Sequence, residues 1–226
     1  MTKELYIHIG YPKCASTFLQ KNVFPYMKEV NFIHKNPIGT YNDETILLSE
    51  LKEGKNLISY EGLSGPTDTI DENYGSQCKT LRKLKLLYPD AKIILVKRIK
   101  SRWLKSLYKQ FISHPVRANM CKDYDDWYEN ILNKNILNTD DYIATLEDTF
   151  ESVLILDFGD LVINNDLFIQ KICKFMQVSL PSNYNRKRSN VRLNDRQLGL
   201  IRLLGKLKIP TCINKITTLI IRKINE

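Results

Sequence analysis

The sequence predicts an α/β fold, a three-layer sandwich whose central parallel sheet is covered by helices on both faces. Short, continuously apolar runs suit strands that are buried on both sides. These runs alternate with longer segments that have apolar residues at helical spacing, which is typical of parallel sheets. The chain of 226 residues is long enough for one domain with a sizeable core, and it has no internal repeat or low-complexity linker. We therefore expect a single domain over residues 1–226, with a basic helical part at 181–226.

Five runs are predicted to be strands because each has an apolar centre and a breaker or polar residue at its end. The first is followed by Gly10 and Pro12, and the third by Gly62. The fourth is apolar throughout its centre, as expected for the middle of the sheet. The strands are expected at residues 5–9, 30–34, 56–61, 92–98 and 153–158.

The intervening segments are predicted to be helices from their apolar spacing and their end signals. Asp43 is a candidate N-cap, Gly54 is expected to close the helix that Asp43 begins, and Pro89 and Pro115 follow two later helices. Residues 64–75 are expected to form a surface loop. The helices are expected to begin at residue 16 and to cover 43–51, 76–88, 101–113, 123–137, 139–150, 165–176, 195–206 and 212–224.

The net charge of +9 is concentrated at the C-terminal end. Residues 181–226 contain 11 Lys and Arg against 2 Asp and Glu, which equals the net charge of the whole chain. This indicates an anionic partner, such as a nucleotide, an acidic glycan or a membrane surface, or else a solvated basic surface. Residues 212–224 are amphipathic, so peripheral membrane contact is possible, although packing on the domain is favoured.

The remaining composition indicates a cytoplasmic protein without a metal. The five cysteines are scattered, which is typical of free thiols in a reducing compartment, and the three histidines do not have metal-ligand spacing. The first residues contain no apolar leader, and no apolar run is long enough to span a bilayer. We expect no metal cofactor and no nucleic-acid partner.

The segment after the first strand has the features of an anion-binding loop. Gly10 and Pro12 break the strand, and Ser16 and Thr17 are suited to begin a helix. A strand, a tight turn and a helix direct backbone N–H groups toward an anion, and Lys13 adds a full charge. The alternative is an ordinary turn with a solvated lysine. A Walker A loop is not present, because Pro12 precedes the lysine and Cys14 follows it.

The pattern Gly-x-Pro-Lys-x-x-Ser-Thr-x-Leu-Gln over residues 10–20 resembles the 5′-phosphosulfate-binding loop of sulfotransferases that use 3′-phosphoadenosine 5′-phosphosulfate. Cys14 and Ala15 stand where that family often has Gly or Ala, and they keep the loop small. The likeness is to bacterial, carbohydrate-type members. It implies that the co-substrate is bound by Gly10, Pro12, Lys13, Cys14, Ala15, Ser16 and Thr17.

A second segment contains an arginine at a strand end and a hydroxyl on the helix that follows. Arg98 and Ser106 can converge on one phosphate, which the arginine would bind in a bidentate manner. The segment 96–108 resembles the family's 3′-phosphate-binding segment, where an arginine and a serine eight residues later hold that phosphate. The family's proline is replaced by Lys100, and its second arginine is one place early, at Arg102. Trp103, with Leu107 and Phe111, is expected to belong to the core.

Glu61 is the favoured catalytic base because it closes a strand at the same edge of the sheet. Burial would raise the pKa of its carboxyl toward neutrality, so that it could accept a proton from a hydroxyl. Some carbohydrate sulfotransferases have a catalytic glutamate in a similar position, which supports this role. His34 is the main rival and His114 a weaker one, whereas His8 is expected to be a core residue.

Together the two motifs predict transfer of a sulfuryl group to a hydroxyl acceptor, with Lys13 and Glu61 as catalytic residues. The glutamate favours a saccharide or glycan as acceptor. Residues 185–192 form a basic stretch that resembles the family's loop closing over the nucleotide. The alternative is an ordinary solvated loop. The alternatives are a P-loop-type phosphoryl transferase, which the missing Gly-Lys-Ser/Thr disfavours, and a module that binds acidic lipid or glycan through its basic C-terminal helices.

Overall fold

The computed structural model describes residues 3–34, 49–64, 74–132, 139–185 and 195–206. The chain divides into two compact units. The first comprises Met1–Ile99 and Lys134–Ser189, and the second comprises Lys100–Asn133 and Asn190–Glu226. The expectation of a single domain stays a prediction.

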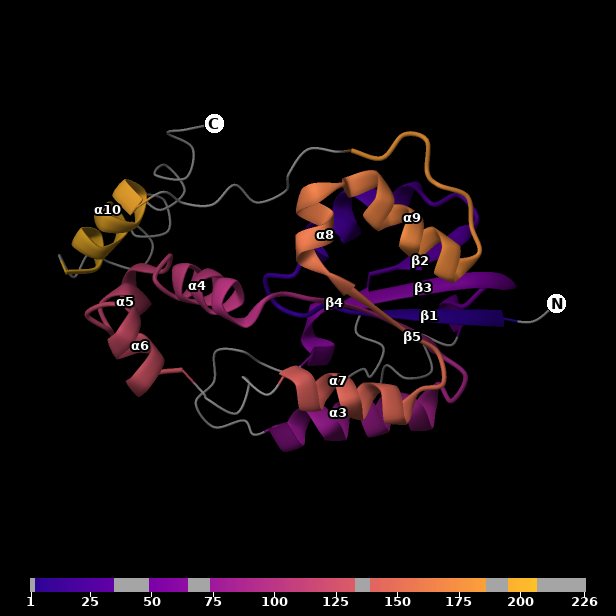
Figure 1. Ribbon diagram of the computed structural model, residues 1–226, viewed down its shortest axis with the longest axis horizontal. Helices are drawn as coiled ribbons and strands as arrows, with labels where there is room; N and C mark the ends of the chain where they lie inside the picture. Colours follow the sequence, from indigo (N-terminus) through magenta and orange to yellow (C-terminus); the bar gives the residue numbers. More distant parts are fainter. Residues whose placement is uncertain (1–2, 35–48, 65–73, 133–138, 186–194, 207–226) are drawn as a thin grey trace. The chain divides into compact units, whose positions relative to one another are not determined.

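The first unit is built on a parallel sheet of five strands in the order β2-β3-β1-β4-β5 (Figure 1). One row of apolar side chains crosses the whole sheet through paired residues, from Ile33 to Ile58, Ile7, Ile93 and Val153. The strands are β1 (Lys3–Ile9), β2 (Val30–Ile33), β3 (Gly54–Tyr60), β4 (Lys92–Lys97) and β5 (Val153–Asp157). The predicted α/β class with a central parallel sheet is confirmed.

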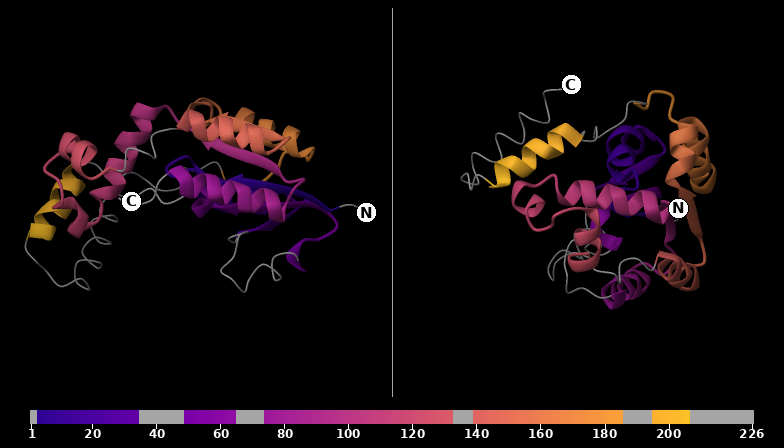
Figure 2. Two further views of the ribbon diagram at one scale, coloured as in Figure 1. Left: turned by 90° about the horizontal axis from the view of Figure 1, so that it is seen from below. Right: turned by 60° about the vertical axis from the view of Figure 1, so that its left-hand side comes forward.

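Helices cover both faces of this sheet. On one face lie α8 (Phe158–Ile163) and α9 (Asn165–Met176), and on the other lie α3 (Tyr74–Leu87) and α7 (Thr139–Thr149) (Figure 1). The right-hand view of Figure 2 shows the same separation of α9 from α3 and α7. Because both faces are covered, β1 is buried from Leu5 to Ile9 and β4 from Ile93 to Val96.

The first helix is less regular than its sequence predicts. It consists of α1 (Ser16–Phe18), a π-helical turn η1 (Leu19–Val23) and a 3₁₀ turn η2 (Phe24–Tyr26). These turns lie on the same face of the sheet as α9 in both figures. In η1 the buried side chain of Gln20 donates to Ser59 Oγ at 3.0 Å. Single π-turns of this kind occur frequently at functional sites.

The second unit consists of α4 (Lys100–Phe111), α5 (Pro115–Ala118), α6 (Tyr124–Asn130) and α10 (Asp195–Lys206). The ring of Tyr108 lies 5.4 Å from that of Tyr124 and 5.5 Å from that of Trp127, so aromatic contacts join α4 to α6. Trp103 and Leu107 are buried, which confirms their expected core role, and Phe111 is half-buried.

Several element boundaries differ from those predicted. Gly54 does not close a helix but begins β3, with a φ of 85°. The helix predicted at 123–137 begins where it was expected, because Asp123 caps it by accepting from Asp126 N at 2.9 Å. It ends earlier than predicted, at Asn130. The short helices α5 and α8 were not predicted, because one turn contains too few residues to show a period. The predicted helix 43–51, except for its last residues, the predicted helix 212–224 and most of the basic stretch 185–192 lie outside the described residues.

The described part of the chain has neither a membrane-spanning helix nor a cluster of metal-binding side chains. None of its helices is long and apolar enough to cross a membrane. It contains no group of three or more His, Cys, Asp and Glu side chains that could hold a metal ion. The four described cysteines, Cys14, Cys78, Cys121 and Cys173, are free thiols.

Candidate active site at the carboxyl edge of the sheet

Four of the predicted residues follow four neighbouring strands of the first unit. Gly10 follows β1, His34 follows β2, Glu61 follows β3, and Arg98 lies one residue after Lys97 at the end of β4. The strands are parallel, so these residues meet at one edge of the sheet. In open α/β sheets, ligands bind at this carboxyl edge.

The loop between β1 and α1 contains two residues in a left-handed conformation. Lys13 has a φ of 60° and Ala15 a φ of 68°, although neither is glycine. Each such residue costs on the order of 1 kcal/mol relative to an ordinary conformation. Alternating left- and right-handed residues turn successive N–H groups toward one concave side, which is how backbone nests hold anions. The conformation therefore suits an anion-binding loop.

Gly10 is required by close packing and not by its backbone angles. A Cβ at this position would lie 2.7 Å from Glu61 Cα, 2.8 Å from Glu61 Cγ and 2.9 Å from Ser16 Oγ. The Gly10 N–H also donates to Tyr60 O at 3.2 Å. The absence of a side chain thus brings the Lys13 loop, Ser16 and Glu61 together at one point.

We expect Gly10→Ala to lower the free energy of unfolding by about 1–3 kcal/mol, the usual cost of overpacking. The added methyl group collides with the Cα of Glu61, which cannot move without shifting the turn that follows β3. Urea denaturation measures the change. Gly199→Ala is the control, since a Cβ there meets no described atom within 4 Å and alanine favours a helix. Equal stability of Gly10→Ala and the wild type would contradict the packing described.

Ser16 is the clearest candidate for a ligand contact in the loop. Its side chain is 2% exposed, and its Oγ has no hydrogen-bond partner among the described residues. It does not cap the helix as the sequence suggested, because Ala15 is the N-cap and makes no side-chain hydrogen bond. A buried hydroxyl without a partner costs about 1–3 kcal/mol, which a bound polar atom would recover. Thr17 is half-buried in the next position.

Lys13 and Arg98 lie together at this edge. Arg98 Nη1 donates to the backbone carbonyl of Lys13 at 3.2 Å, and the Arg98 guanidinium lies over the ring of Phe158, 4.5 Å from its centroid. Burial raises the pKa of the Cys14 thiol to about 12, although the charges of Arg98 and Lys13 oppose the shift. Cys14 is therefore a neutral thiol at physiological pH and serves as a small packing residue.

Ser106, predicted to share a phosphate with Arg98, lies on α4 in the second unit, where it is buried. Its convergence with Arg98 stays a prediction.

The expected burial of Glu61 is wrong. Glu61 is exposed and begins a 3₁₀ turn, η3 (Glu61–Ser64), in place of ending the strand. Its backbone is nevertheless held firmly, because Ser64 Oγ lies 3.1 Å from both Glu61 O and Gly10 O. The amide of Gln77 in α3 donates to Ser64 O and fixes the far end of the turn. Glu61 is thus placed beside the loop, with its carboxylate accessible to a ligand.

The histidines differ in environment. His8 is fully buried, with Nδ1 2.7 Å from Ser59 Oγ, and burial lowers its pKa to about 3, so the prediction of a core histidine is confirmed. His34 is exposed and stacks on Phe32 at 6.3 Å between ring centroids. His114 is the N-cap residue of α5 in the second unit. Of the two histidines in the first unit, His34 lies at the carboxyl edge of the sheet and His8 lies within β1.

Sequence reasoning missed Phe158 and Ser64. Phe158 supports the guanidinium of Arg98, and Ser64 ties the glycine of the loop to the turn of Glu61. Neither belongs to a motif. The sequence places Phe158 at the end of the fifth predicted strand. Its position beside Arg98 could have been predicted only from the order of the strands, because the fifth strand lies next to the fourth in the sheet.

These features define an α/β protein with a strand–turn–helix loop at the carboxyl edge of its parallel sheet. Comparison with solved structures shows that the fold is that of sulfotransferases. A sulfotransferase from Alicyclobacillus acidocaldarius matches with a TM-score of 0.57 and 13% identity, over 91% of this chain and 93% of that one. Mouse sulfotransferase SULT7A1 complexed with PAP matches with a TM-score of 0.54 and 14% identity, over 90% of this chain and 64% of that one. No family model and no curated protein matches the sequence.

Proposed function

We propose that the protein is a sulfotransferase that moves a sulfuryl group from 3′-phosphoadenosine 5′-phosphosulfate to a hydroxyl-bearing acceptor. The observation that supports this most directly is the contact between Arg98 and the loop carbonyl of Lys13. It brings the guanidinium of Arg98, which follows β4, next to the backbone of the loop that follows β1, so that groups from two strand ends can bind one ligand with two phosphate groups. The likeness of the fold to a sulfotransferase complexed with PAP, adenosine 3′,5′-bisphosphate, is consistent with this. A glycan is the favoured acceptor, and the cytoplasm the expected compartment.

The roles follow from the chemistry of the loop. In sulfuryl transfer the acceptor oxygen forms a bond to sulfur while the bond from sulfur to the phosphate oxygen breaks, and the acceptor proton passes to a base. Negative charge therefore grows on the leaving phosphate, where Lys13 would neutralise it. Ser16 and Thr17, with backbone N–H groups of residues 13–17, would hold the 5′-phosphate, and Arg98 with Ser106 the 3′-phosphate. Gly10, Pro12, Cys14 and Ala15 would let the backbone approach closely.

A transfer assay tests the proposal directly. The full chain is incubated with a labelled sulfate donor and a panel of hydroxyl acceptors, with saccharides, phenols and simple alcohols represented. Labelled product, together with calorimetric binding of PAP, is the expected result. Phosphate transfer from ATP that needs magnesium, with no sulfate transfer, would replace the proposal by the phosphoryl-transferase alternative. Binding to acidic liposomes without any transfer would favour the membrane-binding module.

The base can be assigned by comparing Glu61→Gln with His34→Gln. If Glu61 accepts the acceptor proton, Glu61→Gln should lower kcat about 10²–10⁴-fold, the usual contribution of a general base, while PAP binding is unchanged. His34→Gln should then keep near-normal turnover. A large loss in His34→Gln alone would assign the base to the histidine.

A further inference from the structure

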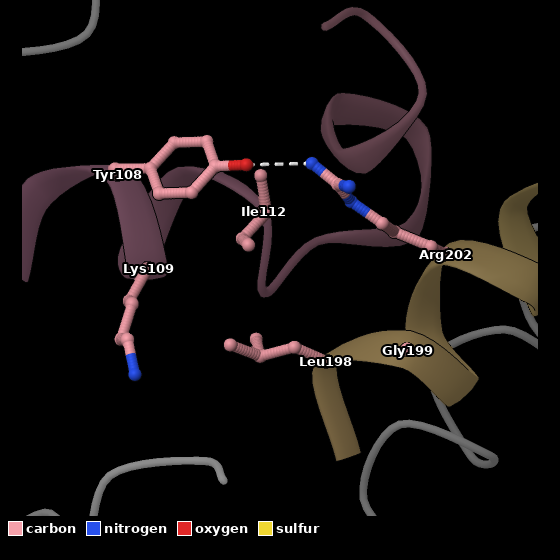
Figure 3. A pocket seen from close by; sticks show the side chains of 6 residues that line it. All are labelled: Tyr108, Lys109, Ile112, Leu198, Gly199 and Arg202. Carbon is pink, nitrogen blue, oxygen red and sulfur yellow. Dashed lines mark hydrogen bonds between the residues drawn. The ribbon is translucent and has the colours of Figure 1, made fainter. Parts of the chain in front are cut away.

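The second unit contains a pocket whose lining residues have no assigned role in the proposed reaction. It has a volume of about 260 Å³ and lies between α4 and α10. Figure 3 shows Tyr108 and Lys109 of α4, with Ile112 directly after that helix, on one side, and Leu198, Gly199 and Arg202 of α10 on the other. Ile112 and Leu198 are buried and give the pocket apolar walls. At about 30 Å³ for each water-sized group, the space suits a ligand of roughly nine such groups.

Gly199 keeps this space open. It stands in the interior of α10, where glycine costs about 1 kcal/mol relative to alanine. Its φ is not in the left-handed region, and a Cβ built on it meets no described atom within 4 Å. Neither the backbone nor the packing of the described residues therefore requires a glycine here. A larger side chain at position 199 would fill the pocket.

The polar groups of the pocket favour an anion. Two of its six lining residues, Lys109 and Arg202, are cations, and none is acidic. Arg202 is held rigidly, since Nη1 donates to Lys122 O at 2.9 Å and Nη2 donates to Tyr108 Oη at 2.7 Å. Burial raises the pKa of Tyr108, so its hydroxyl keeps a proton that can be donated. The second unit as a whole has 14 Lys and Arg against 6 Asp and Glu, a net charge of +8.

We propose that this pocket binds a small amphipathic anion, with its apolar chain between Ile112 and Leu198 and its head group near Lys109. Apolar walls favour the chain through loss of water, and the cations select a negative head group. None of the six residues that line the pocket is assigned a role in sulfuryl transfer. The proposed binding therefore stands whether or not the protein transfers sulfate.

Octanoate is a suitable probe, because it joins a carboxylate to an apolar chain of the required size. Calorimetry on the full chain should show saturable binding at one site. Octanol lacks the charge and acetate lacks the chain, so both should bind at least tenfold more weakly. Lys109→Met should weaken octanoate binding but leave octanol binding unchanged, because it removes the charge and keeps the length of the side chain.

A matched pair of substitutions locates the site. Gly199→Phe fills the pocket and should weaken octanoate binding at least tenfold, while phenylalanine is a better helix former than glycine and the fold should be kept. Leu200→Phe places the same ring on the neighbouring residue, which is 48% exposed and does not line the pocket, and it should bind as the wild type does. Thermal unfolding checks that both variants fold. Equal octanoate affinity in both variants, or no saturable binding to the wild type, would overturn the proposal.

Discussion

Lys13→Ala is expected to lower kcat/KM for sulfuryl transfer about 10²–10³-fold, corresponding to about 2.7–4 kcal/mol of lost transition-state stabilisation. The lysine follows β1 in a loop whose backbone is already held in an unfavourable conformation, with a φ of 60° at Lys13 itself. Such a loop has its backbone N–H groups in place before the reaction begins, so the backbone needs little reorganisation when charge develops on the leaving phosphate. The loss should appear mainly in kcat, because the leaving phosphate carries more negative charge in the transition state than in the bound substrate.

Lys28→Ala is the matched control, since Lys28 is exposed and lies beyond the turns that follow the loop. It should retain wild-type turnover. The left-handed backbone conformation at residue 13 is as unfavourable for alanine as it is for lysine. Urea denaturation should therefore accompany the kinetics and show that Lys13→Ala remains folded. A folded Lys13→Ala protein with full turnover would exclude the proposed role of the lysine in charge stabilisation.

The sequence was most informative where one physical cause determines the pattern. A strand buried on both faces has to be apolar, so β1 and β4 could be located from their apolar runs. Parallel strands end at one edge, so the residues after them could be expected to meet, as Lys13 and Arg98 do. The helix α9 was predicted with its observed bounds because its amphipathic period is long and Asn164 caps it.

The remainder depends on contacts between residues far apart in the chain. The burial of Glu61 was wrong because a strand-end position does not reveal the turn that exposes the side chain. The strict requirement for Gly10 follows from Glu61, 51 residues later, and not from any local turn. Likewise the π-helical turn η1 is joined through Gln20 to Ser59, and no spacing in residues 16–26 predicts such a bond.

Arg98→Lys is expected to weaken PAP binding about 10- to 100-fold, although it keeps the positive charge. The Arg98 guanidinium donates to Lys13 O at 3.2 Å and lies over the ring of Phe158, 4.5 Å from its centroid. A lysine cannot reproduce a planar fork that binds a carbonyl and a phosphate together. Charged hydrogen bonds contribute about 1.5–3 kcal/mol, and each 1.4 kcal/mol is tenfold in affinity. Arg82→Lys on α3, an exposed position in the same unit, should have no effect.

Adenosine 5′-monophosphate distinguishes two roles that Arg98 can have. If the guanidinium binds the 3′-phosphate, Arg98→Lys should weaken PAP binding and leave the binding of the monophosphate, which lacks that group, nearly unchanged. If its main role is to hold the loop through Lys13 O, both ligands should lose affinity equally, because the loop would bind the 5′-phosphate that they share. Lys13→Ala provides the comparison, since it should weaken both ligands. Equal losses for PAP and the monophosphate in Arg98→Lys would therefore make Arg98 a positioning residue, and the 3′-phosphate site would have to be sought elsewhere.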